Sequence, residues 1–270
     1  MNQVTRVLVV ANQKGGVGKT TTAINLGTAL AAVGQKTLII DLDPQGNAST
    51  GLGIKKQNTT LSTFHVMVDE RQLHEVIQPT AVPNLYIAPS TLDLLGVEME
   101  IASDKQRSRR LQKALSALQI AAAEQADIHF GYVLIDCPPS LNLLTINALV
   151  AANSVIVPLQ CEFFALEGLS QLLSTIEHVR DTMNPTLKIH GIVLTMFDPR
   201  NNLAGQVMAD VRAFMGDKVY DTVIPRNVRI SEAPSFGKPA LLYDLKCSGS
   251  QAYLRLASEV IQRERLRFAA

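Results

Sequence analysis

The stretch Gln13-Lys14-Gly15-Gly16-Val17-Gly18-Lys19-Thr20-Thr21 follows a short apolar run, Val7–Ala11, and opens a segment with helical periodicity, Thr20–Ala32. Glycines let backbone N–H groups turn toward phosphate oxygens, and a helix that begins there adds the partial positive charge of its N-terminus. A strand, a glycine-rich loop ending in Gly-Lys-Thr and a helix, in that order, are typical of a phosphate-binding loop. The sequence therefore predicts a nucleotide site made of Gly15, Gly16, Val17, Gly18, Lys19, Thr20 and Thr21.

Two side chains of this loop have expected roles toward a nucleotide. We expect Lys19 to bridge the β- and γ-phosphates and the Thr20 hydroxyl to bind Mg²⁺. The expected ligands of the loop are therefore a nucleotide and Mg²⁺. The likeness of this loop to that of a known class of ATPases, whose residues are given below, implies that the nucleotide is ATP or ADP and that the reaction is hydrolysis of ATP to ADP and phosphate.

Three acidic residues follow apolar runs that read as strands. Asp41 and Asp43 end the run that begins at Leu38, and Asp136 ends the run Tyr132–Asp136, which looks like a Walker B motif. Parallel sheets bind ligands at the carboxyl ends of their strands, so these acids are expected beside the phosphate loop. Mg²⁺ keeps much of its hydration and uses few protein ligands, so we expect Asp136 to hold the metal through water.

Short apolar runs alternate with helical patterns along the chain, which predicts βαβ units. The expected strands are Val7–Ala11, Thr37–Asp41, Leu85–Ala88, Tyr132–Asp136, Ser154–Leu159, Ile189–Phe197 and Val219–Ile224, and the expected helices are Thr20–Ala32, Arg107–Ala126, Leu143–Ala151, Ala165–Met183, Leu203–Phe214 and Gln251–Arg263. The fold class is therefore α/β: a P-loop fold with a twisted, mostly parallel sheet and helices on both faces, in a single domain over residues 1–270. The stretch Gly53–Gln78 breaks the rhythm, and two packing helices are favoured there over an excursion beside the nucleotide.

Composition excludes several classes of protein. Apolar residues make up 47% of the chain, charged residues 18% and aromatic residues 5%, with no Trp, which is a globular composition without a surface for stacking bases. The three cysteines are too scattered for a disulfide framework, and we expect a reduced, cytoplasmic setting with no signal peptide and no membrane span. The net charge is only +1, but 12 basic and 15 acidic residues precede Arg180, whereas 13 basic and 9 acidic residues follow from it onward. A polyanion site is therefore expected in the C-terminal third.

The loop departs from the common spacing because Gln13 holds the first glycine position and Lys14 follows it. This resembles the deviant Walker A loop of the class of ATPases that includes ParA, MinD and the nitrogenase iron protein. The resemblance implies an ATP-dependent homodimer in which Lys14 reaches the phosphates of the partner subunit.

Most of the chain resembles ParA partition ATPases of the Soj type, and five segments carry the likeness: Asn12–Thr22, Asp41–Gly53, Pro158–Leu169, Leu194–Asp198 and Val223–Pro239. By this resemblance, Pro225 and Asn227 lie against adenine, Asp43 orients or activates the attacking water, and Asp41 supports the outer shell of the metal. The candidates for contact with DNA phosphates are Arg200, Arg226, Arg229 and Lys238, with Arg200 and Arg229 favoured.

The resemblance implies a switch that serves chromosome or plasmid segregation. The ATP-bound sandwich dimer binds double-stranded DNA without sequence preference on the nucleoid, and a ParB-type centromere-binding protein stimulates hydrolysis and release. The alternative is a MinD-like membrane-associated ATPase, which needs an amphipathic C-terminal anchor. Leu256 and Val260 suit packing on the sheet, whereas Arg265, Arg267 and Phe268 leave a weak basic and apolar end, so no membrane partner is expected. An iron–sulfur carrier lacks paired cysteines here, and a small-molecule kinase lacks a recognisable lid.

Overall fold

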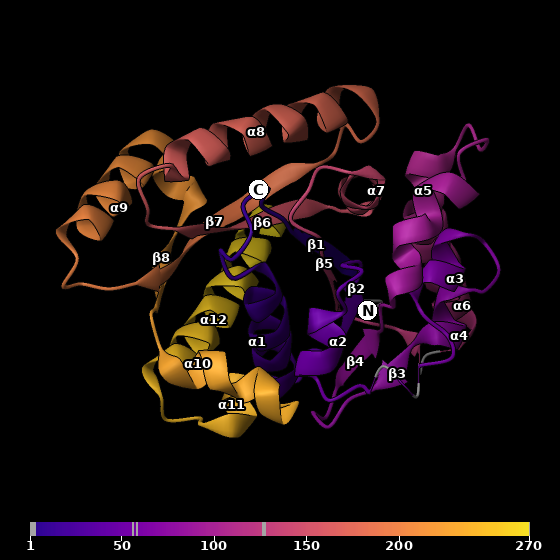
Figure 1. The fold of residues 1–270 in the computed structure, drawn as a ribbon, viewed down its shortest axis with the longest axis horizontal. Coiled ribbons are helices and arrows are strands. Elements are labelled where there is room, and N and C mark those ends of the chain that lie inside the picture. Colours follow the sequence, from indigo (N-terminus) through magenta and orange to yellow (C-terminus); the bar gives the residue numbers. More distant parts are fainter. Residues whose placement is uncertain (1–3, 56, 58, 126–127, 270) are drawn as a thin grey trace.

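The computed structural model describes residues 4–269 except 56, 58, 126 and 127, with side chains to residue 266. Eight strands form one sheet in the order β3-β4-β2-β5-β1-β6-β7-β8 (Figure 1). The strands are β1 (Arg6–Val10), β2 (Thr37–Asp41), β3 (Gln78–Pro79), β4 (Leu85–Ala88), β5 (Tyr132–Asp136), β6 (Ser154–Gln160), β7 (Lys188–Phe197) and β8 (Val219–Pro225). All pairings are parallel except that of β3 with β4. The expected α/β fold with a mostly parallel sheet is confirmed, and β3 is the strand that the sequence did not reveal.

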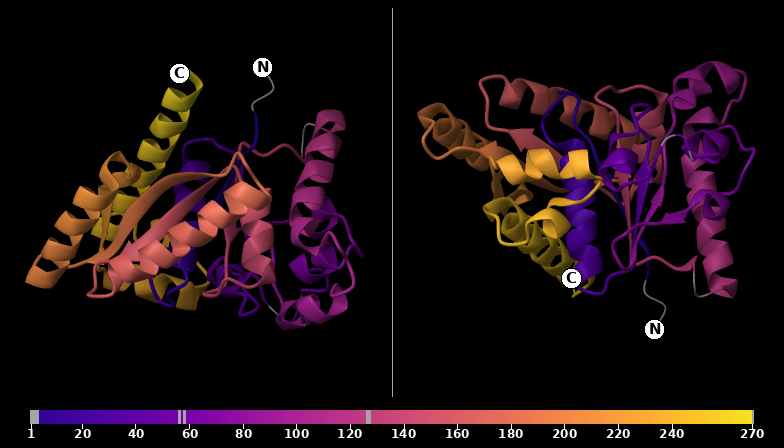
Figure 2. Two further views of the ribbon diagram at one scale, coloured as in Figure 1. Left: turned by 90° about the horizontal axis from the view of Figure 1, so that it is seen from above. Right: turned by 60° about the horizontal axis from the view of Figure 1, so that its bottom comes forward.

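Helices cover both faces of this sheet (Figures 1 and 2). Neighbouring side chains of a strand point to opposite faces, so Val7 and Val9 of β1 join one apolar cluster and Leu8 joins the other. The first cluster includes buried residues of α6 (Arg110–Glu124), α7 (Leu143–Ala151), α8 (Ala165–Thr182) and α9 (Asn202–Met215). The second includes α1 (Lys19–Ala32) and α12 (Ser248–Ala269).

Shorter helices fill the connections at the ends of the sheet. They are α2 (Asn47–Gly51), α3 (Thr63–Met67), α4 (Leu73–Val76), α5 (Val97–Glu100), α10 (Val228–Glu232) and α11 (Ala240–Tyr243), with 3₁₀ turns η2 (Leu92–Gly96), η3 (Arg107–Arg109), η5 (Gly216–Lys218) and η6 (Ala233–Phe236). Within Gly53–Gln78, both α3 and α4 pack against α6, as the favoured interpretation expected.

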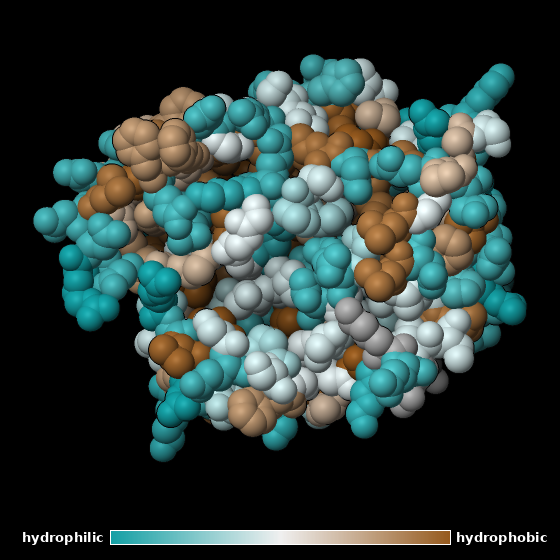
Figure 3. All heavy atoms as spheres, in the orientation of Figure 1, coloured by the Kyte–Doolittle hydropathy of each residue, from teal (hydrophilic) through white to brown (hydrophobic). Residues whose placement is uncertain are grey.

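The C-terminal helix α12 places its apolar side in the core. Tyr253, Leu256 and Val260 are buried on the sheet beside α1. This arrangement agrees with the packing interpretation of the C-terminal segment; the side chains of Arg267 and Phe268 lie outside the described residues. Hydrophilic and hydrophobic residues are interspersed over the face of the molecule in Figure 3. In the part of the chain that the structure describes, no helix is both long enough and apolar enough to cross a bilayer.

Side chains satisfy the outer edge of the last strand, β8. The carboxylate of Glu259 accepts hydrogen bonds from the backbone N–H groups of Asp221 and Thr222, at 2.9 and 3.0 Å. Arg263 donates to the Val219 carbonyl at 2.9 Å, and Arg212 donates to the Tyr220 carbonyl at 3.1 Å. Polar backbone groups at this edge are therefore bonded within the same chain.

A buried polar cluster closes the amino ends of β1, β7 and β8. His190 Nδ1 lies 2.5 Å from the Tyr220 hydroxyl, and His190 Nε2 lies 3.0 Å from Glu264 Oε1. The second carboxylate oxygen of Glu264 faces Arg6 Nε at 3.1 Å. The ring of Tyr220 can approach β7 because residue 191 is glycine: a Cβ there would lie 2.7 Å from the ring. We call Arg6, His190, Tyr220 and Glu264 the amino-end cluster.

Candidate functional site

The phosphate loop joins β1 to α1 at the carboxyl end of the sheet. Gly16 and Gly18 have φ values of 75° and 88°, in the left-handed region that side-chain-bearing residues rarely adopt. The helix begins directly at Lys19, and its N-cap, Gly18, provides no side-chain hydrogen bond. The first N–H groups of α1 are therefore available to an anion.

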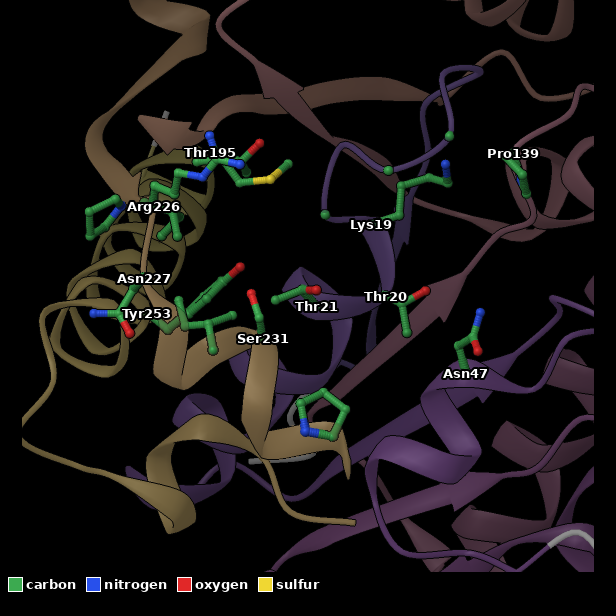
Figure 4. Close-up of a pocket in the computed structure, with 18 of the residues that line it drawn as sticks. Lys19, Thr20, Thr21, Asn47, Pro139, Thr195, Arg226, Asn227, Ser231 and Tyr253 are labelled. Carbon is green, nitrogen blue, oxygen red and sulfur yellow. The ribbon is translucent and has the colours of Figure 1, made fainter. Parts of the chain in front are cut away.

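A cavity of about 510 Å³ opens above this loop (Figure 4). Lys19 and Thr20 lie on one side of it, and Asn227 and Tyr253 lie opposite. Of the expected site residues, those that line the cavity are Gly15, Gly16, Gly18, Lys19, Thr20, Thr21, Asp43, Pro225, Arg226 and Asn227. Val17 is buried beneath the loop, where its carbonyl accepts a 2.8 Å hydrogen bond from Thr195.

Several lining residues were not expected from the sequence. They are Gln45, Asn47, Pro139, Thr195, Met196, Ile224, Ile230, Ser231, Pro234 and Tyr253. Tyr253 is fully buried in α12, and its hydroxyl lies 3.3 Å from that of Thr22 on α1, 231 positions away in the chain. No local pattern signals such a contact, because it arises from the packing of α1 on α12.

Lys19 carries its ammonium group into a nearly buried position. Its Nζ donates a 2.9 Å hydrogen bond to the Lys14 carbonyl, which spans the loop. Burial lowers the pKa of Lys19, while the nearby carboxyl of Asp136 acts in the opposite direction. A polyanion in the cavity would meet this charge with little water to screen it.

Asp136 is a fully buried carboxyl group whose charge the surrounding protein compensates only in part. Neither of its oxygens has a hydrogen-bond partner among the described residues. Burial, and secondly the charge of Asp41, hold the pKa of Asp136 well above its usual range, and the nearby Thr20 hydroxyl lowers it only in part. A buried carboxyl that is only partly compensated, beside a hydroxyl, fits the oxygen ligands that hydrated Mg²⁺ takes. Thr20 and Asp136 are thus the residues that could hold the metal.

Asp41 and Asp43 differ in how their oxygens are used. In Asp41, Oδ2 accepts from the Ser49 N–H at 2.9 Å and from its hydroxyl at 2.7 Å, and Oδ1 accepts from the Asp43 N–H at 3.2 Å. Burial raises the pKa of Asp41 to about 6 despite these bonds. Asp43 uses one oxygen, Oδ1, to accept from the Gln45 N–H at 2.9 Å, and it lines the cavity. Asp41 therefore orders the segment that follows β2, while Asp43 faces the nucleotide space.

Lys14 lies outside the cavity that its own loop forms. Its ammonium group is ion-paired with Glu162, which follows β6, and its side chain is 42% exposed. The backbone N–H of Lys14 is held by the Asn12 side chain at 3.0 Å, and Asn12 in turn donates to the Pro158 carbonyl at 2.8 Å. The backbone of Lys14 is therefore held in place, whereas its ammonium group lies at the surface.

The four expected DNA-contacting residues fall into two groups. Arg200 makes a two-point hydrogen bond with Asp198, at 2.9 and 2.8 Å, and is 88% exposed. Arg229 pairs with Glu232 at 3.0 Å. Arg226 and Lys238 are exposed, and no ion pair involves them within the described part of the chain; Arg226 lines the nucleotide cavity and Lys238 lines a smaller one beside it. The two favoured residues are thus the ones whose charge is already partly neutralised.

A glycine-rich loop at a helix N-terminus, a buried lysine and a buried, only partly compensated carboxyl at one sheet edge define a P-loop nucleotide-binding protein. A family model described as an AAA domain matches residues 5–189. The chain is 61% identical over 264 residues to "Chromosome partitioning protein ParA" of Caulobacter vibrioides, covering 98% of this chain and 97% of that protein. It is 49% identical over 255 residues to "Sporulation initiation inhibitor protein Soj" of Bacillus subtilis, covering 94% and 98%.

The chain belongs to the ParA/Soj family of chromosome-partitioning ATPases. Among solved structures it resembles "Cobyrinic Acid a,c-diamide synthase from Mycobacterium smegmatis with bound ADP and Magnesium", with a TM-score of 0.82 and 36% identity over 97% of this chain and 96% of that one. The expectation of an ATPase that uses ATP or ADP with Mg²⁺ is confirmed at the level of the family.

Proposed function

We propose that this ATPase is a nucleotide-timed DNA partition switch. In its ATP state, two copies form a face-to-face dimer that binds double-stranded DNA on the nucleoid, in the cytoplasm. A ParB-type centromere-binding protein stimulates hydrolysis, and the ADP form separates and leaves the DNA. The observation that carries the proposal is the position of Lys14, whose ammonium group lies outside its own cavity at the surface. From there, on exchanging its exposed ion pair with Glu162 for phosphate, it completes the site of a second copy.

The residues around the cavity have different roles in one cycle of ATP hydrolysis. The loop N–H groups and Lys19 bind and orient the phosphates, and Pro225 and Asn227 hold the base. Thr20 and Asp136 would hold Mg²⁺, with support from Asp41, and the ion would supply positive charge to offset that of the phosphates. Asp43 orients the attacking water, since its carboxylate lines the cavity and retains an oxygen that no described hydrogen bond uses.

The DNA surface consists of Arg200, Arg226, Arg229 and Lys238. These residues follow the carboxyl ends of β7 and β8, next to the nucleotide cavity. A backbone contact links this region to the segment after Asp43: a Cβ on Gly237 would lie 2.9 Å from the Gly53 Cα. Phosphate contacts by such side chains give binding that ignores sequence and depends steeply on salt.

One variant of the phosphate loop, with a control on α6, tests the dimer. Lys14→Ala should leave nucleotide binding to the monomer within about twofold of wild type but weaken the ATP-dependent dimer, because the lost charge serves the partner subunit. Light scattering after size exclusion, with ADP and with a non-hydrolysable ATP analogue, measures this. Lys113→Ala, which removes another exposed lysine distant from the cavity, is the control. A full ATP-dependent dimer in Lys14→Ala would refute the role in trans.

The salt dependence of DNA binding tests the surface. Each phosphate contact contributes about −0.9 to the log–log salt slope, so losing Arg200 and Arg229 from both subunits should flatten the slope by roughly three to four units. ATP-dependent dimerisation should stay normal in this double alanine variant. If the slope is unchanged and the dimer is intact, Arg226 and Lys238 are the next pair to replace. Tight DNA binding without nucleotide would contradict the switch itself.

A further inference from the structure

Ser90 lies directly behind Asp43, although it does not line the nucleotide cavity. It follows β4, its side chain is buried, and its hydroxyl donates a 2.5 Å hydrogen bond to the backbone carbonyl of Asp43. The same carbonyl accepts from the Gly46 N–H at 2.8 Å, which closes the turn after Asp43. Ser90 thus holds the backbone of the residue that faces the nucleotide.

A second serine connects Ser90 to the neighbouring carboxylate. The backbone N–H of Ser90 donates to the Ser49 hydroxyl at 3.0 Å, and that hydroxyl donates to Asp41 Oδ2 at 2.7 Å. Both serines are about 1% exposed, so water does not compete for these hydrogen bonds. A series of hydrogen bonds thus runs from Asp41 through Ser49 and Ser90 to Asp43. It ties the acidic residue that ends β2, and the next one along the sequence, to the end of β4.

We propose that Ser90, supported by Ser49, is a positioning residue that fixes Asp43 for hydrolysis. The inference rests on the proposed role of Asp43. The side chain of Asp43 makes only one described hydrogen bond, to Gln45, within its own turn. The direction of its free oxygen then depends on how its backbone is held: Asp41 accepts from the Asp43 N–H, and Ser90 holds the Asp43 carbonyl. A displacement of about 1 Å at a reacting group can reduce a rate by roughly 100-fold.

The decisive measurement is a double-mutant cycle of Ser90→Ala and Asp43→Ala, followed by steady-state ATP hydrolysis in the presence of DNA. Ser90→Ala alone should lower kcat by roughly tenfold and leave KM within about twofold, since the phosphate cradle is untouched. In the Asp43→Ala background, Ser90→Ala should change the residual rate by less than about twofold, because the group it positions is gone.

The matched control is Thr28→Val, which removes another buried hydroxyl. Thr28 is 2% exposed and donates to the Ile24 carbonyl within α1, away from the acidic loop. It should lower thermal stability to a similar degree and leave kcat unchanged. If Ser90→Ala misfolds, Ser90→Cys keeps the size of the side chain with a weaker donor and should give an intermediate kcat.

Amide hydrogen exchange gives a readout that does not depend on turnover. In the nucleotide-free protein, Ser90→Ala should speed exchange at Gln45 and Gly46 by roughly tenfold, since both amides bond to Asp43. Thr28→Val should not. Independent, multiplicative effects on kcat, or unchanged exchange at these two amides, would overturn the inference. If instead Asp43→Ala itself hydrolyses ATP at the wild-type rate, the proposed role of Asp43 fails, whatever Ser90 does.

Discussion

Buried charge is treated in opposite ways at the two ends of this sheet. In the amino-end cluster, Arg6, Glu264 and His190 each face a partner at 3.0 to 3.1 Å. At the carboxyl end, Asp136 is fully buried with neither oxygen hydrogen-bonded within the described protein, and Lys19 is nearly buried with a lowered pKa. The amino end therefore resembles an ordinary protein core, whereas the carboxyl end has buried charged groups that a bound ligand would compensate.

Charged residues at the amino end of the sheet serve to stabilise the fold, whereas those at the carboxyl end serve to bind a ligand. A buried charge with a partner can contribute to stability, whereas one without a partner costs free energy until something compensates it. Burial raises the carboxyl pKa values of Asp41 and Asp136 at the carboxyl end for this reason. Substitutions at the two ends should therefore have effects of opposite kind, and the following four variants test that expectation.

The largest effect is expected for Lys19→Ala at the carboxyl end. Removing this nearly buried ammonium group should weaken binding of Mg·ATP by roughly 1,000-fold, since a preorganised charge on the phosphates is lost. The free energy of unfolding without nucleotide should change by about 1 kcal/mol or less. Equilibrium titration and denaturant unfolding measure the two quantities. Normal ATP affinity would remove the basis for the phosphate-loop assignment.

Glu264→Ala should have the reverse pattern. Its loss leaves Arg6 and His190 without the carboxylate between them, and the free energy of unfolding should fall by about 3 kcal/mol. Affinity for ATP, measured well below the melting temperature, should stay within about twofold. A large loss of affinity with normal stability would mean that the two ends of the sheet are not separate in function.

Asp136→Asn should stabilise the nucleotide-free protein by about 2 kcal/mol at pH 8 and abolish the Mg²⁺ dependence of nucleotide binding. The pKa of Asp136 is raised in the folded state, so protonation favours folding, and this stability is lost as the pH rises from the unfolded value near 4. Asp41, with a pKa of about 6, adds to the same trend. The difference in the free energy of unfolding between Asp136→Asn and the wild type should shrink toward zero near pH 4. Urea unfolding at several pH values checks this. An advantage that does not vary with pH would contradict it.

The smallest effect is expected for Tyr220→Phe in the amino-end cluster. This variant removes the hydroxyl that faces His190 and keeps the ring that packs against Gly191. The free energy of unfolding should therefore fall by about 1 kcal/mol. The melting temperature of the variant should fall below that of the wild type by the same amount with and without nucleotide. A change in melting temperature that depends on nucleotide would connect this cluster to the nucleotide site.

Sequence predicted the features that short segments specify. The strand, glycine loop and helix around Lys19 are contiguous, so their signal is local, and the apolar runs gave all the long strands. β3 was missed because it has two residues and one of them is Pro79. Tyr253 and Ser90 were missed because their partners are distant in the chain: 231 positions separate Tyr253 from Thr22, and 47 separate Ser90 from Asp43. Such contacts follow from tertiary packing, which no local pattern carries.

The edge of β8 has a consequence for how copies of this protein can associate. An exposed edge strand is a template for another strand, and it leads to fibres or aggregates when nothing covers it. Here Glu259, Arg212 and Arg263 already occupy backbone groups of that edge. The opposite edge, β3, is two residues long, and its Pro79 has no N–H to offer. Polymerisation by strand addition is therefore disfavoured at both ends of the sheet, so a high local concentration of this protein need not lead to amyloid-like assembly.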